Sequence, residues 1–100
     1  MATIIAQSRW PSSSSEKLAK AWLGMDDVPD TQKLIWAGTL DDIKAGVKGL
    51  VIWQCDDSKI ADTLSWIRKD LVRYNAVPGF SCSVNVWTEP EEALKVLGIV

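Results

Sequence analysis

Residues 50–55 read Leu50-Val51-Ile52-Trp53-Gln54-Cys55, and this stretch decides the fold. It is apolar almost throughout. A short apolar run of this kind is typical of a β-strand that is covered on both faces and lies in the centre of its sheet. We therefore place a central strand here and extend the interpretation outward in both directions.

Three further elements are predicted after this strand. Four apolar residues recur at intervals of 4, 3 and 4 within a segment of about 58–74, which predicts an amphipathic helix: Ile60, Leu64, Ile67 and Leu71. Residues 80–87 alternate between apolar and mostly polar side chains, as in a half-buried strand. Thr88 and Glu91 have the spacing of a capping box with Pro90 between them, so a last short helix is predicted from Thr88.

The sequence before the central strand supplies the remaining elements. Residues 3–10 are apolar at first and then partly alternating, which indicates a first strand. The segment of about 14–25 carries one apolar helical face, made of Leu18, Ala21, Trp22 and Met25. Residues 33–40 are typical of a second strand, in which Leu34 and Trp36 share one face, and 41–49 form a hairpin connection.

The order of elements is β-α-β-β-α-β followed by a short helix, which is the split-βαβ pattern. We predict one domain over residues 1–100, of α+β class and ferredoxin-like, with a four-stranded antiparallel sheet plus a short C-terminal helix. Right-handed crossovers place both long helices on one face, with the first and third strands central. Cys55 and Cys82 then lie two strand spacings apart, ~9–10 Å, which is too far for a disulfide.

The second face of this sheet predicts a partner. In the third strand Leu50 and Ile52 point one way and Val51 and Trp53 the other, so both faces are apolar. Two helices cover only one face, and an uncovered apolar patch usually marks an interface or a ligand site. A two-fold homodimer is the commonest way to bury such a patch. We therefore expect this chain to pair with a copy of itself through its sheet.

The composition excludes several classes of function. The formal net charge of −2 lacks the concentrated basic face of nucleic-acid-binding proteins, so we expect no nucleic-acid partner. We expect no membrane association, since no run approaches ~20 apolar residues, and the absence of a basic leader makes the cytoplasm the expected location. The chain has no histidine and its glycines are scattered. We therefore predict no metal, no cofactor and no Ser-His or Cys-His catalytic site.

The candidate ligand-binding residues are polar groups and tryptophans within the predicted strands. Arg9 is suited to hold a carboxylate or enolate, and tryptophans on strands suit a flat apolar or aromatic ligand. The first strand pairs with the fourth in this fold, which brings the polar residues of both strands together. The predicted set is Gln7, Arg9, Trp36, Trp53, Ser83 and Asn85. The alternative interpretations are packing for the tryptophans and a solvated edge for the polar residues.

Several short motifs also resemble a known superfamily. These are Arg9-Trp10-Pro11 at the end of the first strand, Val51-Ile52-Trp53 followed by Asp56-Asp57, and the closing Phe80 strand followed by Glu91-Glu92-Ala93-Leu94. Together with the length and the order of elements, they resemble small members of the dimeric α/β-barrel superfamily. The resemblance implies that two ferredoxin-like sheets pack face to face into a barrel.

Three functions stay open at this stage. The first is a small-molecule-binding or sensing homodimer with a pocket in the barrel interior. The second is a cofactor-independent enzyme resembling a monooxygenase or isomerase, in which Arg9, Gln7 and Asn85 polarise the substrate. The third is a structural interaction module. A pocket on the sheet face that contains a strand carboxylate or Tyr74 favours the enzyme, whereas a filled interface favours the structural module.

Overall fold

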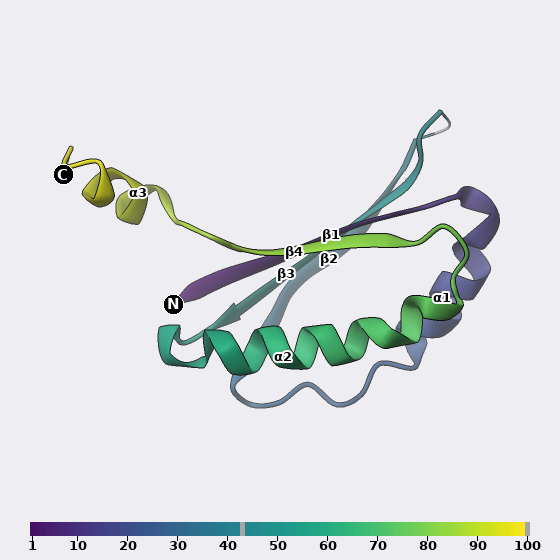
Figure 1. Ribbon diagram of the computed structural model, residues 1–100, viewed down its shortest axis with the longest axis horizontal. Helices are drawn as coiled ribbons and strands as arrows, with labels where there is room; N and C mark the ends of the chain where they lie inside the picture. The colour runs from purple at the N-terminus through teal and green to yellow at the C-terminus, as the bar shows by residue number, and fades with distance from the viewer. Residues whose placement is uncertain (43, 100) are drawn as a thin grey trace.

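Four strands form one antiparallel sheet in the order β2-β3-β1-β4 (Figure 1). The strands are β1 (Ala2–Trp10), β2 (Gln32–Asp42), β3 (Gly46–Cys55) and β4 (Ser81–Trp87). This computed structural model describes residues 1–42 and 44–99. The apolar stretch 50–55 lies in β3, which is central as predicted, and the ferredoxin-like α+β fold is confirmed.

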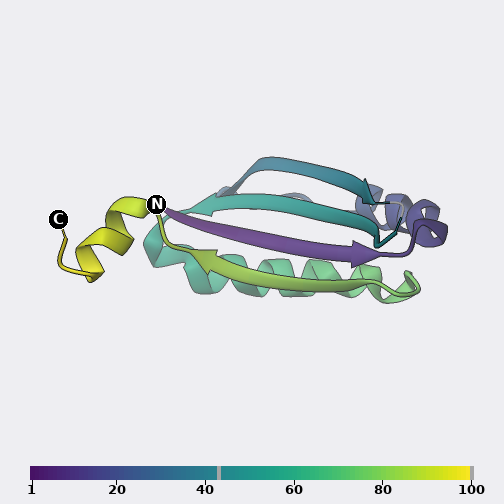
Figure 2. The same ribbon diagram turned by 90° about the horizontal axis from the view of Figure 1, so that it is seen from above.

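The helices α1 (Ser15–Leu23) and α2 (Ile60–Leu71) lie on the same side of this sheet (Figure 1). Short 3-10 turns, Ser12–Ser14 and Asp57–Lys59, precede them, and a third, Val72–Ala76, continues α2. Figure 2 shows that α3 (Pro90–Val96) extends away from the sheet beyond the end of β4. Among residues 1–42 and 44–99, no helix has the length and apolar character needed to cross a bilayer.

The register of the strands determines which side chains share a face. Ile4 of β1 lies opposite Trp53 of β3, and both are buried on the face covered by the helices. In β2 the register shifts between Leu34 and Trp36, which is a bulge. Leu34 therefore lies on the helix side and Trp36 on the opposite side. The prediction that these two residues share a face is wrong, because the bulge inserts one residue between them.

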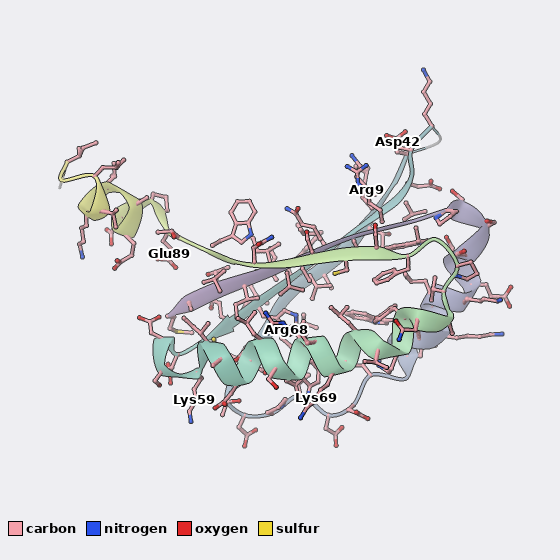
Figure 3. All side chains as sticks on the ribbon, in the orientation of Figure 1. Arg9, Asp42, Lys59, Arg68, Lys69 and Glu89 are labelled. Carbon is pink, nitrogen blue, oxygen red and sulfur yellow. The ribbon has the colours of Figure 1, made fainter. Side chains whose placement is uncertain are left out.

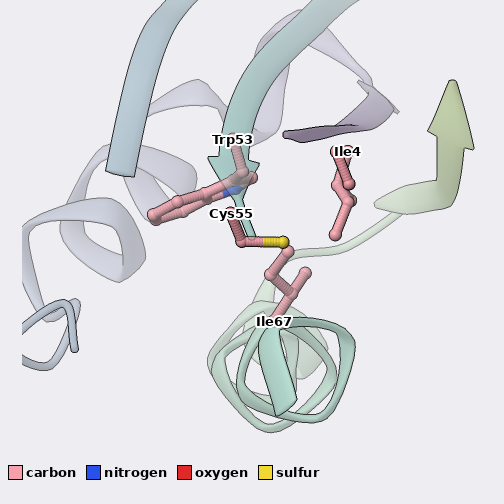
Figure 4. Close-up of a cluster of buried hydrophobic side chains, with 5 residues drawn as sticks. Ile4, Trp53, Cys55 and Ile67 are labelled. Carbon is pink, nitrogen blue, oxygen red and sulfur yellow. The ribbon is translucent and has the colours of Figure 1, made fainter. Parts of the chain in front are cut away.

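The core lies between α2 and the central strands (Figure 4). Ile4 is 0% exposed, and Trp53, Cys55 and Ile67 pack around it. The Trp53 ring also meets the edge of the Trp66 ring, with 5.4 Å between ring centroids. Aromatic pairs of this geometry add about 1 kcal/mol to the stabilisation from burial alone. The apolar stripe predicted for the second helix thus supplies the core.

Several predicted boundaries and roles differ from the structure. Glu89, one residue after Thr88, occupies the N-cap position of α3, so the predicted capping box is wrong. The hairpin connection is shorter than predicted, because β2 continues to Asp42 and β3 begins at Gly46, whose φ of 86° suits glycine. Trp22 is half-buried, although its position on the α1 stripe predicted a core residue.

Candidate ligand-binding site on the open sheet face

The face of the sheet opposite α1 and α2 is called here the open face. Alternation along the strands and the register between them place on it side chains from all four strands. Its apolar members are Ile5, Trp36, Leu40, Leu50, Ile52 and Trp87. Trp36 is 52% exposed and Leu40 is 63% exposed. The open face therefore carries the uncovered apolar patch that the sequence predicts, and Trp36 and Trp87 belong to it.

The structure brings five of the six predicted ligand-binding residues onto the open face. Gln7 of β1 lies directly opposite Ser83 of β4, and Arg9 and Asn85 follow the same alternation on these strands. Trp36 joins them from β2.

Trp53 is separated from the other five candidates by the thickness of the sheet. It is 3% exposed and belongs to the core beneath the helices. The sequence could not assign its face, because every residue of 50–53 is apolar and alternation gives no signal there. Trp53 therefore contributes to the packing of the core.

A groove of about 640 Å³ crosses the open face. It is lined by four of the predicted residues, Gln7, Arg9, Trp36 and Ser83, while Asn85 lies outside it. The Trp36 ring covers Gly38, since a Cβ at that glycine would lie 2.3 Å from the ring. Glycine at position 38 thus allows the ring to lie along the strand, toward the part of the groove that holds Arg9.

Two cationic side chains lie side by side in this groove. Arg9 of β1 is directly opposite Lys48 of β3 in the antiparallel register, and both line the groove. Figure 3 shows Arg9 on the side of the sheet away from α2. In the part of the chain that the structure describes, the ion pairs involve other residues. Like charges directly opposite each other destabilise a sheet, so this pair favours an anion between or beside them.

Lys48 was missed by sequence reasoning, which placed it in the hairpin connection. Alternation from Leu50 and Ile52 would have placed it on the open face once β3 was extended to Gly46. The groove's hydrogen-bonding groups next to the cations come from Gln7, Ser81 and Ser83. The site therefore combines a cationic pair, small hydroxyl groups and an exposed indole ring.

Both cysteines are free thiols, as the predicted strand order requires. β1 lies between the strands that carry Cys55 and Cys82. Cys82 is half-buried, and its burial raises the pKa of the thiol above the ordinary value. At neutral pH it is therefore protonated and a poor nucleophile. Over the described ranges 1–42 and 44–99, no three His, Cys, Asp or Glu side chains gather into a group suited to a metal ion.

Of the comparisons with known proteins, the superposition on one solved structure supports the fold. No protein-family model matches the sequence. No curated protein matches it either. Among solved structures, a formyltetrahydrofolate deformylase from Pseudomonas putida superposes with a TM-score of 0.51 at 15% identity, over 83% of this chain and 28% of that protein. A formyltetrahydrofolate deformylase from Burkholderia mallei gives 0.42 at 7% identity, over 84% of this chain and 27% of that protein. The likeness to the first concerns the fold, and this chain spans little more than a quarter of that protein's length.

Proposed function

We propose that this protein is a small-molecule-binding homodimer in which two open faces pack together and enclose the groove. The support for pairing is the apolar surface of the open face, which includes Trp36, Leu40 and Trp87. Large exposed apolar patches on one face usually mark an interface, and a two-fold dimer buries the same patch on both copies. Stacked sheets lie about 10 Å apart, a distance that side chains of this size fill.

The ligand that fits the groove is a small aromatic acid. The single observation that carries this proposal is that the Arg9–Lys48 pair and the exposed Trp36 ring line the same groove. A guanidinium group binds a carboxylate through two parallel hydrogen bonds, and an indole ring stacks on a flat ligand. Gln7 and Ser83 add hydrogen-bonding groups. The ring of the ligand lies on Trp36 and its carboxylate on Arg9.

The chemistry of the groove supports binding rather than catalysis. Among residues 1–42 and 44–99, those that line the groove include neither a carboxylate nor a tyrosine. Tyr74, the tyrosine considered from the sequence as a general base, lies on the helix side of the sheet instead. Proton abstraction needs a base within hydrogen-bonding reach of the substrate. A sensing or carrier role is therefore better supported than the monooxygenase or isomerase alternative.

Calorimetric titration with 2-naphthoate tests this proposal. The matched neutral probe is 2-naphthalenemethanol, which has the same rings without the acid. Arg9→Gln removes the charge in the groove, and Arg68→Gln removes an exposed arginine on α2 as a control. We expect 2-naphthoate to bind better than the alcohol, and Arg9→Gln to weaken it by about tenfold or more. Arg68→Gln is expected to leave the affinity unchanged.

Two results contradict the proposal. Equal affinity for the acid and the alcohol shows that no cation recognises the ligand. Equal weakening by Arg9→Gln and Arg68→Gln shows that the acid responds to the overall charge of the protein rather than to the groove.

A further inference from the structure

A second hollow lies on the other side of the sheet, between the sheet and α1. Its volume is about 460 Å³, and its walls include Trp10, Trp22, Trp53, Tyr74 and Phe80. This hollow is called here the α1 cavity. Its size lies within the range of about 300–1,000 Å³ that is typical of small-molecule sites, and aromatic walls are typical of them too.

The floor of the α1 cavity is a row of small side chains. Thr39, Gly49, Ser8 and Cys82 lie next to one another across all four strands and face the helices. Each of these four residues lines the cavity. Farther along the same face, Ile4 and Cys55 pack against Ile67 of α2 and belong to the core. The sequence thus leaves space beneath α1 because the side chains there are too short to reach it.

The roof of the cavity is the amphipathic helix α1, whose first residue, Ser15, accepts a hydrogen bond from the Trp10 indole of β1. The apolar face of α1 includes Leu18 and Trp22, and both line the cavity. Every residue of α1 is nevertheless exposed or half-buried. Protein interiors are packed as densely as organic crystals, and a helix of nine residues depends on packing for its stability. An apolar ligand between α1 and the sheet would add contacts to the helix face that carries Leu18 and Trp22.

The residues that line the cavity determine which kind of ligand it accepts. The Trp10 and Phe80 rings stack with centroids 6.4 Å apart, and the Phe80 and Tyr74 rings with centroids 4.8 Å apart. Asp70 is the one carboxylate among the described residues that line the cavity, and Arg73 donates a hydrogen bond of 2.6 Å to it. Because that charge is neutralised, the cavity favours an uncharged ligand. The Tyr74 phenol, whose pKa is raised mainly by burial, stays protonated at neutral pH and offers a hydrogen-bonding group.

We propose that the α1 cavity is a second binding site, for an uncharged, mostly apolar molecule of two or three rings. An apolar cavity of about 150 Å³ binds one benzene molecule, so 460 Å³ accommodates two or three such rings. The α1 cavity and the groove lie on opposite faces of the sheet, and the strand residues that line both of them are Ser8, Gly38, Thr39, Gly49, Leu50 and Cys82. Binding in the α1 cavity requires neither a homodimer nor the Arg9–Lys48 pair.

The fluorescent probe N-phenyl-1-naphthylamine tests the site, since it is uncharged and has three rings. Ala19 of α1 lines the cavity, and Ala19→Phe places a ring into it. Ala61→Phe is the matched control, since Ala61 is an exposed alanine in α2 outside the cavity lining. Circular dichroism establishes that both variants are folded. We expect saturable binding of one probe per chain, weakened by about tenfold or more in Ala19→Phe and unchanged in Ala61→Phe.

A second measurement separates this site from the groove on the open face. Arg9→Gln is expected to leave the affinity for N-phenyl-1-naphthylamine unchanged, whatever its effect on 2-naphthoate. The probe is also expected to raise the melting temperature of the wild type and of Ala61→Phe more than that of Ala19→Phe. Failure to saturate, or equal binding by both phenylalanine variants, overturns the proposal. A loss of probe binding in Arg9→Gln that equals the loss in Ala19→Phe overturns it as well.

Discussion

Replacing Trp53 by alanine tests how the structure divides the strand tryptophans between the two faces. Trp53 is 3% exposed and packs against Trp66, whereas Trp36 is 52% exposed on the open face. Trp36 pairs with Ile52, the residue before Trp53, so the two tryptophans are close in the sheet and differ in face. Their comparison therefore isolates the effect of burial.

The expected magnitude follows from the packing of each ring. Truncating a buried tryptophan to alanine costs about 3–5 kcal/mol, because apolar contacts are lost and a cavity remains. The net stability of a small domain is about 5–15 kcal/mol, so Trp53→Ala removes much of it. Trp36→Ala loses a ring that is half exposed, and we expect a cost of about 1 kcal/mol at a protein concentration too low for pairing.

Urea unfolding followed by far-ultraviolet circular dichroism measures both values without relying on tryptophan fluorescence. With a slope of about 2 kcal/mol per molar urea, the Trp53→Ala midpoint is expected to fall by roughly 2 M. A cost below about 1 kcal/mol for Trp53→Ala refutes the placement of this ring in the core. A cost for Trp36→Ala as large as that for Trp53→Ala refutes the division between the faces.

Three further predictions concern the helix side of the sheet. Gly49→Val is expected to destabilise the fold by about 1–3 kcal/mol in urea unfolding, because a Cβ at this position would lie 2.5 Å from Ser8 Oγ and 2.8 Å from the Trp10 ring. Gly24→Ala is the control and is expected to be tolerated, because the atom nearest to a Cβ at position 24 is 3.5 Å away. Asp70→Asn is expected to lower the free energy of unfolding by about 2 kcal/mol in the same assay, because it removes the charged partner of the mostly buried Arg73. An unchanged urea midpoint in this variant contradicts the importance of the pair. Burial raises the pKa of Tyr74 in the folded protein above the ordinary value of 10.0. The contribution of the Tyr74 phenol to the free energy of unfolding is therefore present below pH 10 and is lost as the pH rises through the folded-state pKa. Tyr74→Phe is expected to reduce this alkaline loss in urea unfolding between about pH 8 and pH 11, and an equally steep loss in the variant contradicts the assignment.

The strands and helices of this fold could be predicted from the sequence because their apolar periodicities are strong. The 4, 3, 4 spacing from Ile60 to Leu71 places α2 correctly, and alternation places β4. The apolar run at 50–55 also identifies the central strand. These signals depend only on which residues avoid water, and such a pattern is visible in the sequence alone.

The division of residues between the two faces could not be predicted, because it depends on the register between strands. The bulge between Leu34 and Trp36 turns Trp36 toward the open face. No glycine or proline lies between these two residues to indicate a bulge from the sequence. Trp53 was a candidate for the site because it is a tryptophan on a strand, and the apolar residues around it in 50–53 give no signal of its face. Only its pairing with Ile4 fixes its side.

The α1 cavity could not be predicted for a related reason. Its floor is assembled from four strands, each of which contributes one small residue, so no local stretch of sequence reveals it. The Arg9–Lys48 pair is likewise created by register. In both cases the chemistry of the site arises from residues that lie far apart along the chain.

Sedimentation equilibrium tests most directly the proposal that the open face pairs with a copy of itself. The wild type is expected to sediment at micromolar concentration with twice the chain mass of 11.0 kDa. Leu40→Glu places a charge on the open face at a position 63% exposed in the single chain, and it is expected to sediment as one chain. Val72→Glu, at a position 62% exposed just after α2, is the matched control and is expected to remain dimeric. A wild type that sediments as a single chain, or equal dimerisation of Leu40→Glu and Val72→Glu, contradicts pairing through the open face.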